Sequence, residues 1–227
     1  MERGRVHIII VAGGSGSRFG ADVPKQYCLL GGRPVLMHTI CRMRSALPDA
    51  EITLVVSAGM EAYWRELCAR HSFESPHVVH GGATRSESVR NAMRSLPAGT
   101  DIVLVHDGAR PLTCRAVVDA AVEAVCRGAD GAIPAVAVTD SLRMVHADGT
   151  NTAADRSAYR AVQTPQAFDA KKLAAAYAST AESFSDDASL MEHCGYTDIV
   201  LTQGAPSNIK ITNPMDLSIA ELLLTRE

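Results

Sequence analysis

The sequence has no apolar segment long enough to cross a membrane, because no apolar run in its 227 residues approaches 18 residues. The first ten residues, MERGRVHIII, hold too short an apolar run for a secretory signal peptide. These absences argue against a membrane-bound or secreted protein. We therefore expect a cytoplasmic protein with no membrane partner.

Paired cysteines and a large excess of one charge are also missing. The six cysteines are scattered without a C-x-x-C pair, which argues against a zinc site or a disulfide framework. A net charge of -3 gives no overall attraction to nucleic acid. No nucleic-acid partner is therefore expected, and any recognition of phosphate has to be local.

Strand-like and helix-like patterns alternate along most of the chain. This alternation predicts an α/β fold, in which one Rossmann-like domain over residues 1–227 has a mostly parallel sheet flanked by helices. The length suits one such domain. The expected strands cover residues 6–12, 51–58, 77–82, 101–107, 131–137 and 199–204. Residues 31–47 are expected to begin with a turn and Pro34 and to continue as a helix, and the other expected helices cover residues 60–71, 84–96, 114–127, 169–180, 186–195 and 213–227.

The first expected strand, Val6–Ala12, ends in a loop that contains four glycines and the cations Arg18 and Lys25. Glycines let backbone N–H groups approach an anion, and the cations add full positive charges, so the loop suits a nucleoside triphosphate. A tight turn from strand to helix is the simpler alternative. The loop lacks the Gly-Lys-Ser/Thr of a P-loop, and its glycines miss the spacing of a dinucleotide-binding fingerprint.

Two further turns follow expected strands and should meet the first loop at the carboxyl edge of the sheet. One is GGATRSES, residues 81–88, where Thr84 and Glu87 have the spacing of a capping box. The other is HDGAR, residues 106–110, where Asp107 is a candidate magnesium ligand because Mg²⁺ prefers carboxylates and phosphates. A capped helix and a solvated turn are the respective structural alternatives.

Residues 137–160 contain few core-forming side chains and include the turn sequence ADGT. They predict a protruding β-arm, which is too poor in core residues to stand alone in water and should pack on another subunit. Near the C-terminus, Lys210 lies between Ile209 and Ile211, so on a strand its side chain points opposite to theirs. Asn213 and Pro214 are expected to begin the last helix.

Five blocks of sequence, taken together, resemble the 2-C-methyl-D-erythritol 4-phosphate cytidylyltransferase family of the non-mevalonate isoprenoid pathway. They are AGGSGSRFGADVPKQ, GGATRSES, HDGAR, DRSAYRAVQTPQAF, and SDDAS with SNIKITNPMDL. The resemblance covers nearly the whole chain. It implies that CTP and methylerythritol phosphate react to give 4-diphosphocytidyl-2-C-methyl-D-erythritol and pyrophosphate.

The resemblance also implies roles for individual residues. The implied catalytic set is Arg18, Lys25, Lys210 and Arg156, with Mg²⁺ held through Asp107. The implied CTP site is Ala12, Gly13, Gly14, Ser15, Gly16, Gly82, Ala83, Ser88, Asp107 and Gly108. The implied methylerythritol phosphate site is Arg110, Ser141, Arg156, Thr164 and Lys210. In this family the arm carrying Arg156 reaches into the neighbouring subunit of a homodimer.

The sequence departs from the family pattern at Ala83, where many members carry an acidic residue, so selection of the base is expected to depend on backbone groups. Three other functions remain open. Ribitol 5-phosphate cytidylyltransferase would share the CTP loops and differ in the arm. The charged residues Arg18, Lys25, Asp107 and Lys210 argue against a non-catalytic nucleotide-binding module. The glycine spacing argues against an NAD-binding oxidoreductase.

Overall fold

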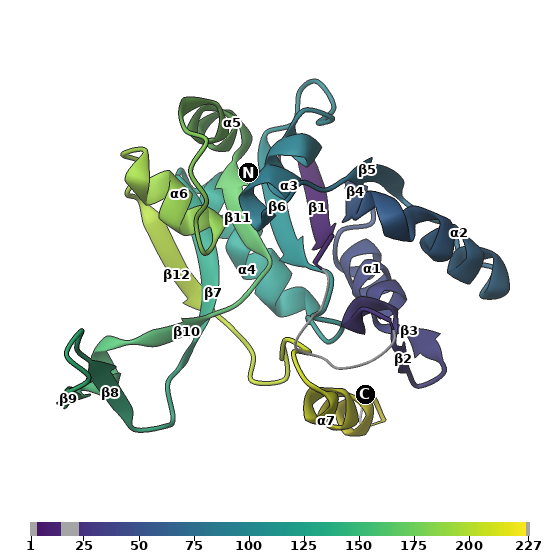
Figure 1. Cartoon of the computed structure of the whole chain (residues 1–227). Coiled ribbons are helices and arrows are strands. Elements are labelled where there is room, and N and C mark those ends of the chain that lie inside the picture. Colours follow the sequence, from purple (N-terminus) through teal and green to yellow (C-terminus); the bar gives the residue numbers. More distant parts are fainter. Residues whose placement is uncertain (1–3, 15–22, 226–227) are drawn as a thin grey trace.

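The computed structural model describes residues 4–14 and 23–225, and it contains a curled, mostly parallel sheet with helices on both faces (Figure 1). The strand order is β10-β7-β11-β6-β1-β4-β5, with β12 beside β7. Strands β10 and β11 run antiparallel to their neighbours. The strands are β1 (Val6–Ala12), β4 (Glu51–Val56), β5 (His77–His80), β6 (Ile102–Asp107), β7 (Gly131–Ala137), β10 (Arg160–Val162), β11 (Gln166–Asp169) and β12 (Ile199–Gln203). The expected α/β fold is confirmed.

Helices cover both faces of the sheet because the central strands are apolar on both sides. In β1, Ile8 and Ile10 point into one core cluster and Ile9 points into the other, and all three are fully buried. The first cluster includes residues of α1 (Val35–Ala46), α2 (Glu61–Arg70) and α4 (Arg115–Cys126). The second includes residues of α3 (Arg85–Met93), α5 (Ala170–Ser179) and α6 (Asp187–His193).

The last helix, α7 (Pro214–Leu224), begins where the sequence predicts. The Asn213 side chain accepts a hydrogen bond from the Asp216 N–H, and the Asp216 carboxylate accepts one from the Asn213 N–H. The helix lies beside the short hairpin of β2 (Leu29–Leu30) and β3 (Arg33–Pro34). Short 3-10 turns cover Lys25–Tyr27, Ala58–Met60 and Arg156–Ala158.

The arm is a hairpin of β8 (Leu142–Val145) and β9 (Asn151–Ala154) that stands away from the sheet (Figure 1). Its turn is closed by a hydrogen bond from the Gly149 N–H to the His146 carbonyl. The arm leaves the sheet after β7, which ends at Ala137, and returns at β10, which begins at Arg160. These positions agree with the predicted arm over residues 137–160.

Three details of the sequence interpretation need correction. Strands β10 and β11 were not expected, yet β11 pairs with both β6 and β7 inside the sheet. The segment around Lys210 forms no strand, although Ile211 is buried as an alternating pattern requires. Glu87 does not complete the capping box, because its carboxylate accepts from the Ala83 N–H.

None of the helices within the described ranges is long and apolar enough to span a membrane.

Candidate active site

A cavity of about 390 Å³ opens at the carboxyl ends of β1 and β6. These strands are parallel neighbours, with Val11 opposite Asp107, so the loops that follow them meet at one edge of the sheet. The loop after β5 closes another side of the cavity. The residues lining it are Val11, Ala12, Gly13, Gly14, Lys25, Gln26, Gly82, Ala83, Thr84, Arg85, Ser88, Asp107, Gly108, Ala109, Lys210 and Thr212.

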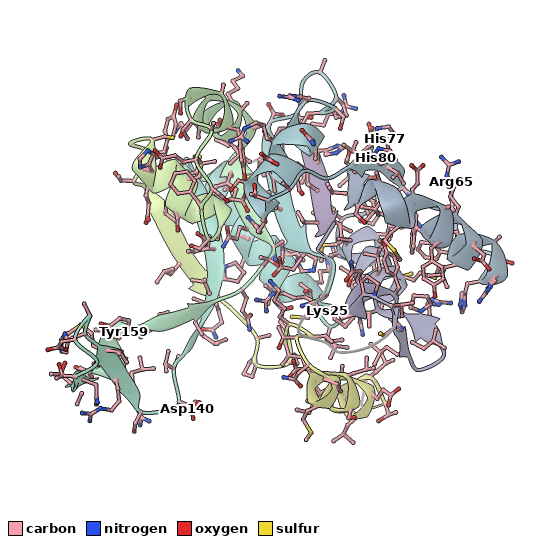
Figure 2. All side chains as sticks on the ribbon, viewed as in Figure 1. Lys25, Arg65, His77, His80, Asp140 and Tyr159 are labelled. Carbon is pink, nitrogen blue, oxygen red and sulfur yellow. The ribbon has the colours of Figure 1, made fainter. Side chains whose placement is uncertain are left out.

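The first loop is held by Gln26, which sequence reasoning did not single out. Its side-chain amide donates to the Ala12 carbonyl at 2.8 Å and to the Gly14 carbonyl at 3.0 Å, and Gln26 is buried. The adjacent Lys25 lines the cavity and is labelled in Figure 2. Three residues predicted for this loop, Ser15, Gly16 and Arg18, lie outside the described residues.

The loop before α3 lines the cavity, and several of its hydrogen-bond donors have partners within the loop. The Gly82 N–H donates to Ser88 Oγ at 3.1 Å, and the Ala83 N–H donates to Glu87 Oε2 at 2.7 Å. The Ser88 hydroxyl in turn donates to the Thr84 carbonyl at 2.9 Å. Because these donors are already used, the backbone carbonyls and the Ser88 oxygen remain to contact a ligand.

Gly82 and Gly108 occupy tight places at the cavity edge. A Cβ at Gly82 would lie 2.4 Å from Glu87 Cβ, so a larger residue cannot fit without a shift of the loop. A Cβ at Gly108 would lie 3.0 Å from both Ala12 Cβ and Leu36 Cδ1, which leaves little room for alanine. Glycine at position 108 therefore lets the segments after β1 and β6 approach closely, and glycine at position 82 lets the loop pack against the first turn of α3.

Asp107 is the acidic centre of the cavity and is paired with two cations. Its Oδ2 lies 3.1 Å from Lys210 Nζ and 3.2 Å from Arg110 Nε. Burial disfavours the charged carboxylate, but Lys210, Arg110 and Arg85 outweigh it and hold the pKa of Asp107 well below its usual range. Asp107 is therefore ionised, and it fixes Lys210 at the cavity.

Thr164 supports Asp107 from beneath instead of facing the cavity. Its hydroxyl accepts from the Asp107 N–H at 3.0 Å and lies 2.9 Å from His106 Nδ1. Burial lowers the pKa of His106 to about 4, so the imidazole is neutral and carries one N–H. Its Nε2 lies 3.3 Å from the Arg110 carbonyl, which can only accept, so the proton is on Nε2 and the Thr164 hydroxyl donates to Nδ1. Arg110 is similarly engaged, since its Nη1 donates to the Asn208 carbonyl at 2.8 Å.

The arm residues predicted for the substrate site do not reach this cavity within one chain. Ser141 lies just before β8, and Arg156 lies after β9, where its guanidinium donates to the Thr139 carbonyl. Figure 2 shows the arm, labelled at Asp140 and Tyr159, well apart from Lys25.

Asp107 is the one acidic residue among the described residues that line the cavity. The described chain holds no group of three or more His, Cys, Asp or Glu side chains that could bind a metal ion by themselves. Mg²⁺ often binds through one or two carboxylates together with substrate phosphates. Asp107 Oδ1 takes no hydrogen bond from the described residues, so this one carboxylate fits that mode.

Nearly the whole chain matches one known protein family. The family model described as IspD, 2-C-methyl-D-erythritol 4-phosphate cytidylyltransferase, matches residues 6–226. A protein of that name from Porphyromonas gingivalis strain W83 is 47% identical over 228 residues, which cover 99% of this chain and all of the relative. The chain belongs to this family.

Solved structures of the cytidylyltransferase family share the fold. A 4-diphosphocytidyl-2C-methyl-D-erythritol synthase from Anaerococcus prevotii superposes with a TM-score of 0.83 at 27% identity, covering 99% of this chain and 100% of that one. A 2-C-methyl-D-erythritol 4-phosphate cytidylyltransferase from Thermus thermophilus gives 0.77 at 31% identity, covering 97% and 99%. The whole chain is therefore built like a cytidylyltransferase of this family.

Proposed function

We propose that the protein joins the cytidylyl group of CTP to 2-C-methyl-D-erythritol 4-phosphate and releases pyrophosphate. The observation that carries this proposal is the convergence of the glycine loop, Lys25, Lys210 and Asp107 on one cavity. In the reaction a phosphate oxygen of the substrate attacks the α-phosphorus of CTP. A new P–O bond forms, the bond to the β-phosphate oxygen breaks, and the electron pair leaves with pyrophosphate.

Charge neutralisation is the main task of such a site, because two anions must meet. A phosphomonoester with a second pKa of about 6 is largely dianionic at neutral pH, so the attack needs no general base. Lys25 and Lys210 supply positive charge inside the cavity, and Asp107 holds Lys210 in place. Arg18 is proposed to act with Lys25, and its place lies outside the described residues.

The acceptors of the Gly82–Ser88 loop favour cytosine over uracil. The 4-amino group of cytosine donates hydrogen bonds, whereas the oxygen at that position of uracil only accepts them. The N–H groups of Gly82 and Ala83 and the hydroxyl proton of Ser88 already have internal partners. The loop can therefore accept from cytosine through carbonyl oxygens and Ser88 Oγ even though Ala83 has no polar side chain.

We assign Asp107 as the residue that would hold Mg²⁺ at the phosphates of CTP, through the Oδ1 atom that faces no donor among the described residues. Bound there, the cation would neutralise phosphate charge. Lys210 and Arg110 keep Asp107 ionised, which preserves its ability to accept a cation.

We further propose a homodimer in which the arm of one subunit completes the cavity of the other. Ser141 and Arg156 lie on a hairpin that stands away from its own cavity, and the arm exposes the apolar side chains of Met144 and Val145. Such a hairpin gains stability by packing on a second chain. Lys210 is proposed to hold methylerythritol phosphate from the opposite side, while Arg110 and Thr164, which do not line the cavity among the described residues, are proposed to support the substrate site through Asp107. The cytoplasm remains the predicted location.

The test is a pyrophosphate-release assay of the purified protein with each of the four nucleoside triphosphates and methylerythritol phosphate. We expect release with CTP and little with UTP, ATP or GTP. Ribitol 5-phosphate is assayed in parallel, since faster turnover with it would reassign the substrate. Binding of CTP without pyrophosphate release from either polyol phosphate would contradict the proposal and favour a non-catalytic module.

A further inference from the structure

The SDDAS block of the sequence lies outside the cavity lining, yet it contacts the cavity through Arg85. Arg85 begins α3 and lines the cavity directly after Gly82–Thr84. Its Nη2 donates to Asp187 Oδ2 at 2.5 Å, and the Tyr177 hydroxyl donates to Asp187 Oδ1 at 2.5 Å. The Asp187 side chain is 0% exposed. One buried carboxylate therefore joins the start of α3 to α5.

The charges of this cluster make its geometry hard to change. Burial disfavours the guanidinium charge, but Asp187 and, at longer range, Asp107 outweigh it and raise the pKa of Arg85. Burial together with Asp187 raises the pKa of Tyr177, so the phenol keeps its proton and stays a donor. Loss of the Asp187 charge would leave the guanidinium, whose side chain is 23% exposed, without its charged partner, which is costly.

Further contacts attach α3 to the same region. The Phe184 N–H donates to Ser86 Oγ at 3.1 Å. Arg90 Nε donates to the Tyr177 carbonyl at 3.1 Å, and the Arg90 guanidinium lies 5.5 Å from the centre of the Tyr177 ring. These contacts hold α3 along its length. Of Arg85, Ser86 and Arg90, only Arg85 also lines the cavity.

Arg85 retains an unused donor beside the nucleotide cavity. Its Nη1 atom is buried and has no hydrogen-bond partner among the described residues. A buried donor without a partner is costly, so its retention needs an explanation such as a structural water or a functional constraint. The guanidinium is held through Nη2 by Asp187, whose other oxygen accepts from the Tyr177 hydroxyl.

We propose that Asp187 and Tyr177 are positioning residues of the nucleotide site. By holding Arg85, they place the start of α3 so that the Gly82 and Ala83 carbonyls and Ser88 face CTP. The inference rests on the proposed function, because it assigns that loop to the cytosine. It predicts that damage to the Asp187 cluster impairs binding of CTP much more than binding of methylerythritol phosphate.

The test compares Asp187→Asn and Tyr177→Phe with the wild type by steady-state kinetics and by calorimetric titration with CTP. Asp187→Asn removes the charge at nearly constant shape and should raise the KM for CTP about tenfold. Tyr177→Phe removes one hydrogen bond and should raise it about threefold. The KM for methylerythritol phosphate should stay within about twofold, because the other substrate meets different residues.

Two controls separate positioning from general stability. Val122→Ala creates a small defect in the buried core of α4, on the other face of the sheet, and should lower the melting temperature without a selective change in the KM for CTP. Arg85→Lys keeps a positive charge but loses the planar guanidinium, and it should weaken CTP binding as Asp187→Asn does. If Asp187→Asn does not fold, Tyr177→Phe and Arg85→Lys decide the question.

Equal increases in the KM of both substrates, or CTP binding unchanged in Tyr177→Phe and Arg85→Lys, would overturn the inference. Its failure is distinct from failure of the proposed function, which is judged by pyrophosphate release from the wild type alone. If the wild type releases none, calorimetric binding of CTP to the same variants still tests the positioning role.

Discussion

At the scale of single residues, the cavity depends on a few cations and backbone groups that neighbouring polar side chains hold in place. Gln26 holds the first loop, Ser88 and Glu87 hold the loop before α3, and Asp107 holds Lys210. None of these contacts is a backbone hydrogen bond within a helix or between strands. Each one instead fixes the direction of a backbone group or cation at the cavity, which is what electrostatic catalysis needs.

Lys25→Ala should reduce turnover with CTP by on the order of 100-fold to 1000-fold, because it removes a positive charge from the place where phosphate charge develops. The stability of the fold should be preserved, since Lys25 lies in a loop at the cavity edge. Initial rates of pyrophosphate release and a melting curve measure both quantities. Lys171→Ala, a change at an exposed lysine of α5, is the charge-matched control. Near-normal turnover in Lys25→Ala would refute the assignment.

Gly82→Ala should impair CTP binding although it adds only one methyl group. The new Cβ would lie 2.4 Å from Glu87 Cβ, so the loop has to move away from its present position. A displacement of about 1 Å can cost on the order of 100-fold in rate. The measurement is kcat/KM for CTP, with Gly59→Ala as the control because no heavy atom lies within 4 Å of its added Cβ. Equal kcat/KM in the two variants would contradict a close approach at Gly82.

At the scale of elements, the sequence predicted most strands and helices of the fold. Apolar runs such as Val6–Ala12 and caps such as Asn213 carry local information, and the structure confirms both. It did not predict β11, because Gln166–Asp169 is a short segment with few apolar residues. That strand forms through pairing with β6 and β7, which are distant in sequence, and no local pattern reports such partners.

Some site residues could be predicted from the sequence, and others depend on partners that are distant in the chain. The loops that follow β1, β5 and β6 meet as the rule for parallel sheets requires, so Lys25, Ser88 and Asp107 share one cavity. Gln26 was missed because its role depends on carbonyl partners in another part of the chain. Arg85 belongs to the predicted GGATRSES turn, but its pairing with Asp187, 102 positions further along the chain, has no local signal. The burial of Thr164 against His106 likewise depends on β11, so sequence reasoning could not foresee it.

Mixed dimers should show whether the arm acts on the other subunit. Lys25→Ala and Arg156→Ala are each expected to be impaired. If each cavity takes Arg156 from its partner, a mixed dimer contains one intact site, and random mixing should restore about a quarter of wild-type activity. The subunits are mixed by co-expression with two affinity tags, and pyrophosphate release is measured.

Lys25→Ala mixed with Lys210→Ala is the matched control, because both residues line the same cavity of one chain. That mixture should gain no activity. Absence of recovery in the first mixture, with mixed dimers isolated through both tags, would place Arg156 in its own chain's site or outside catalysis.

At the scale of the whole molecule, the two faces of the sheet share one set of central strands, so the chain should unfold in one cooperative transition. Such a transition would support the predicted single domain over residues 1–227. Buried ionisable groups then act on the stability of the entire fold. The histidines are the relevant ones near neutral pH, because burial lowers the pKa of both His7 and His106 to about 4.

The free energy of unfolding should fall as the pH is lowered from 7 to 5. Below pH 6.5 the unfolded chain binds a proton on each imidazole, while the folded chain keeps His7 and His106 neutral until about pH 4. Each histidine therefore removes about 2 kcal/mol at pH 5. Guanidinium unfolding at both pH values measures the loss.

His7→Gln keeps a hydrogen-bonding group near Thr53 and should lose about 2 kcal/mol less than the wild type. The exposed His193→Gln should match the wild type, and an equal loss in all three proteins would show that burial of His7 does not govern the acid sensitivity.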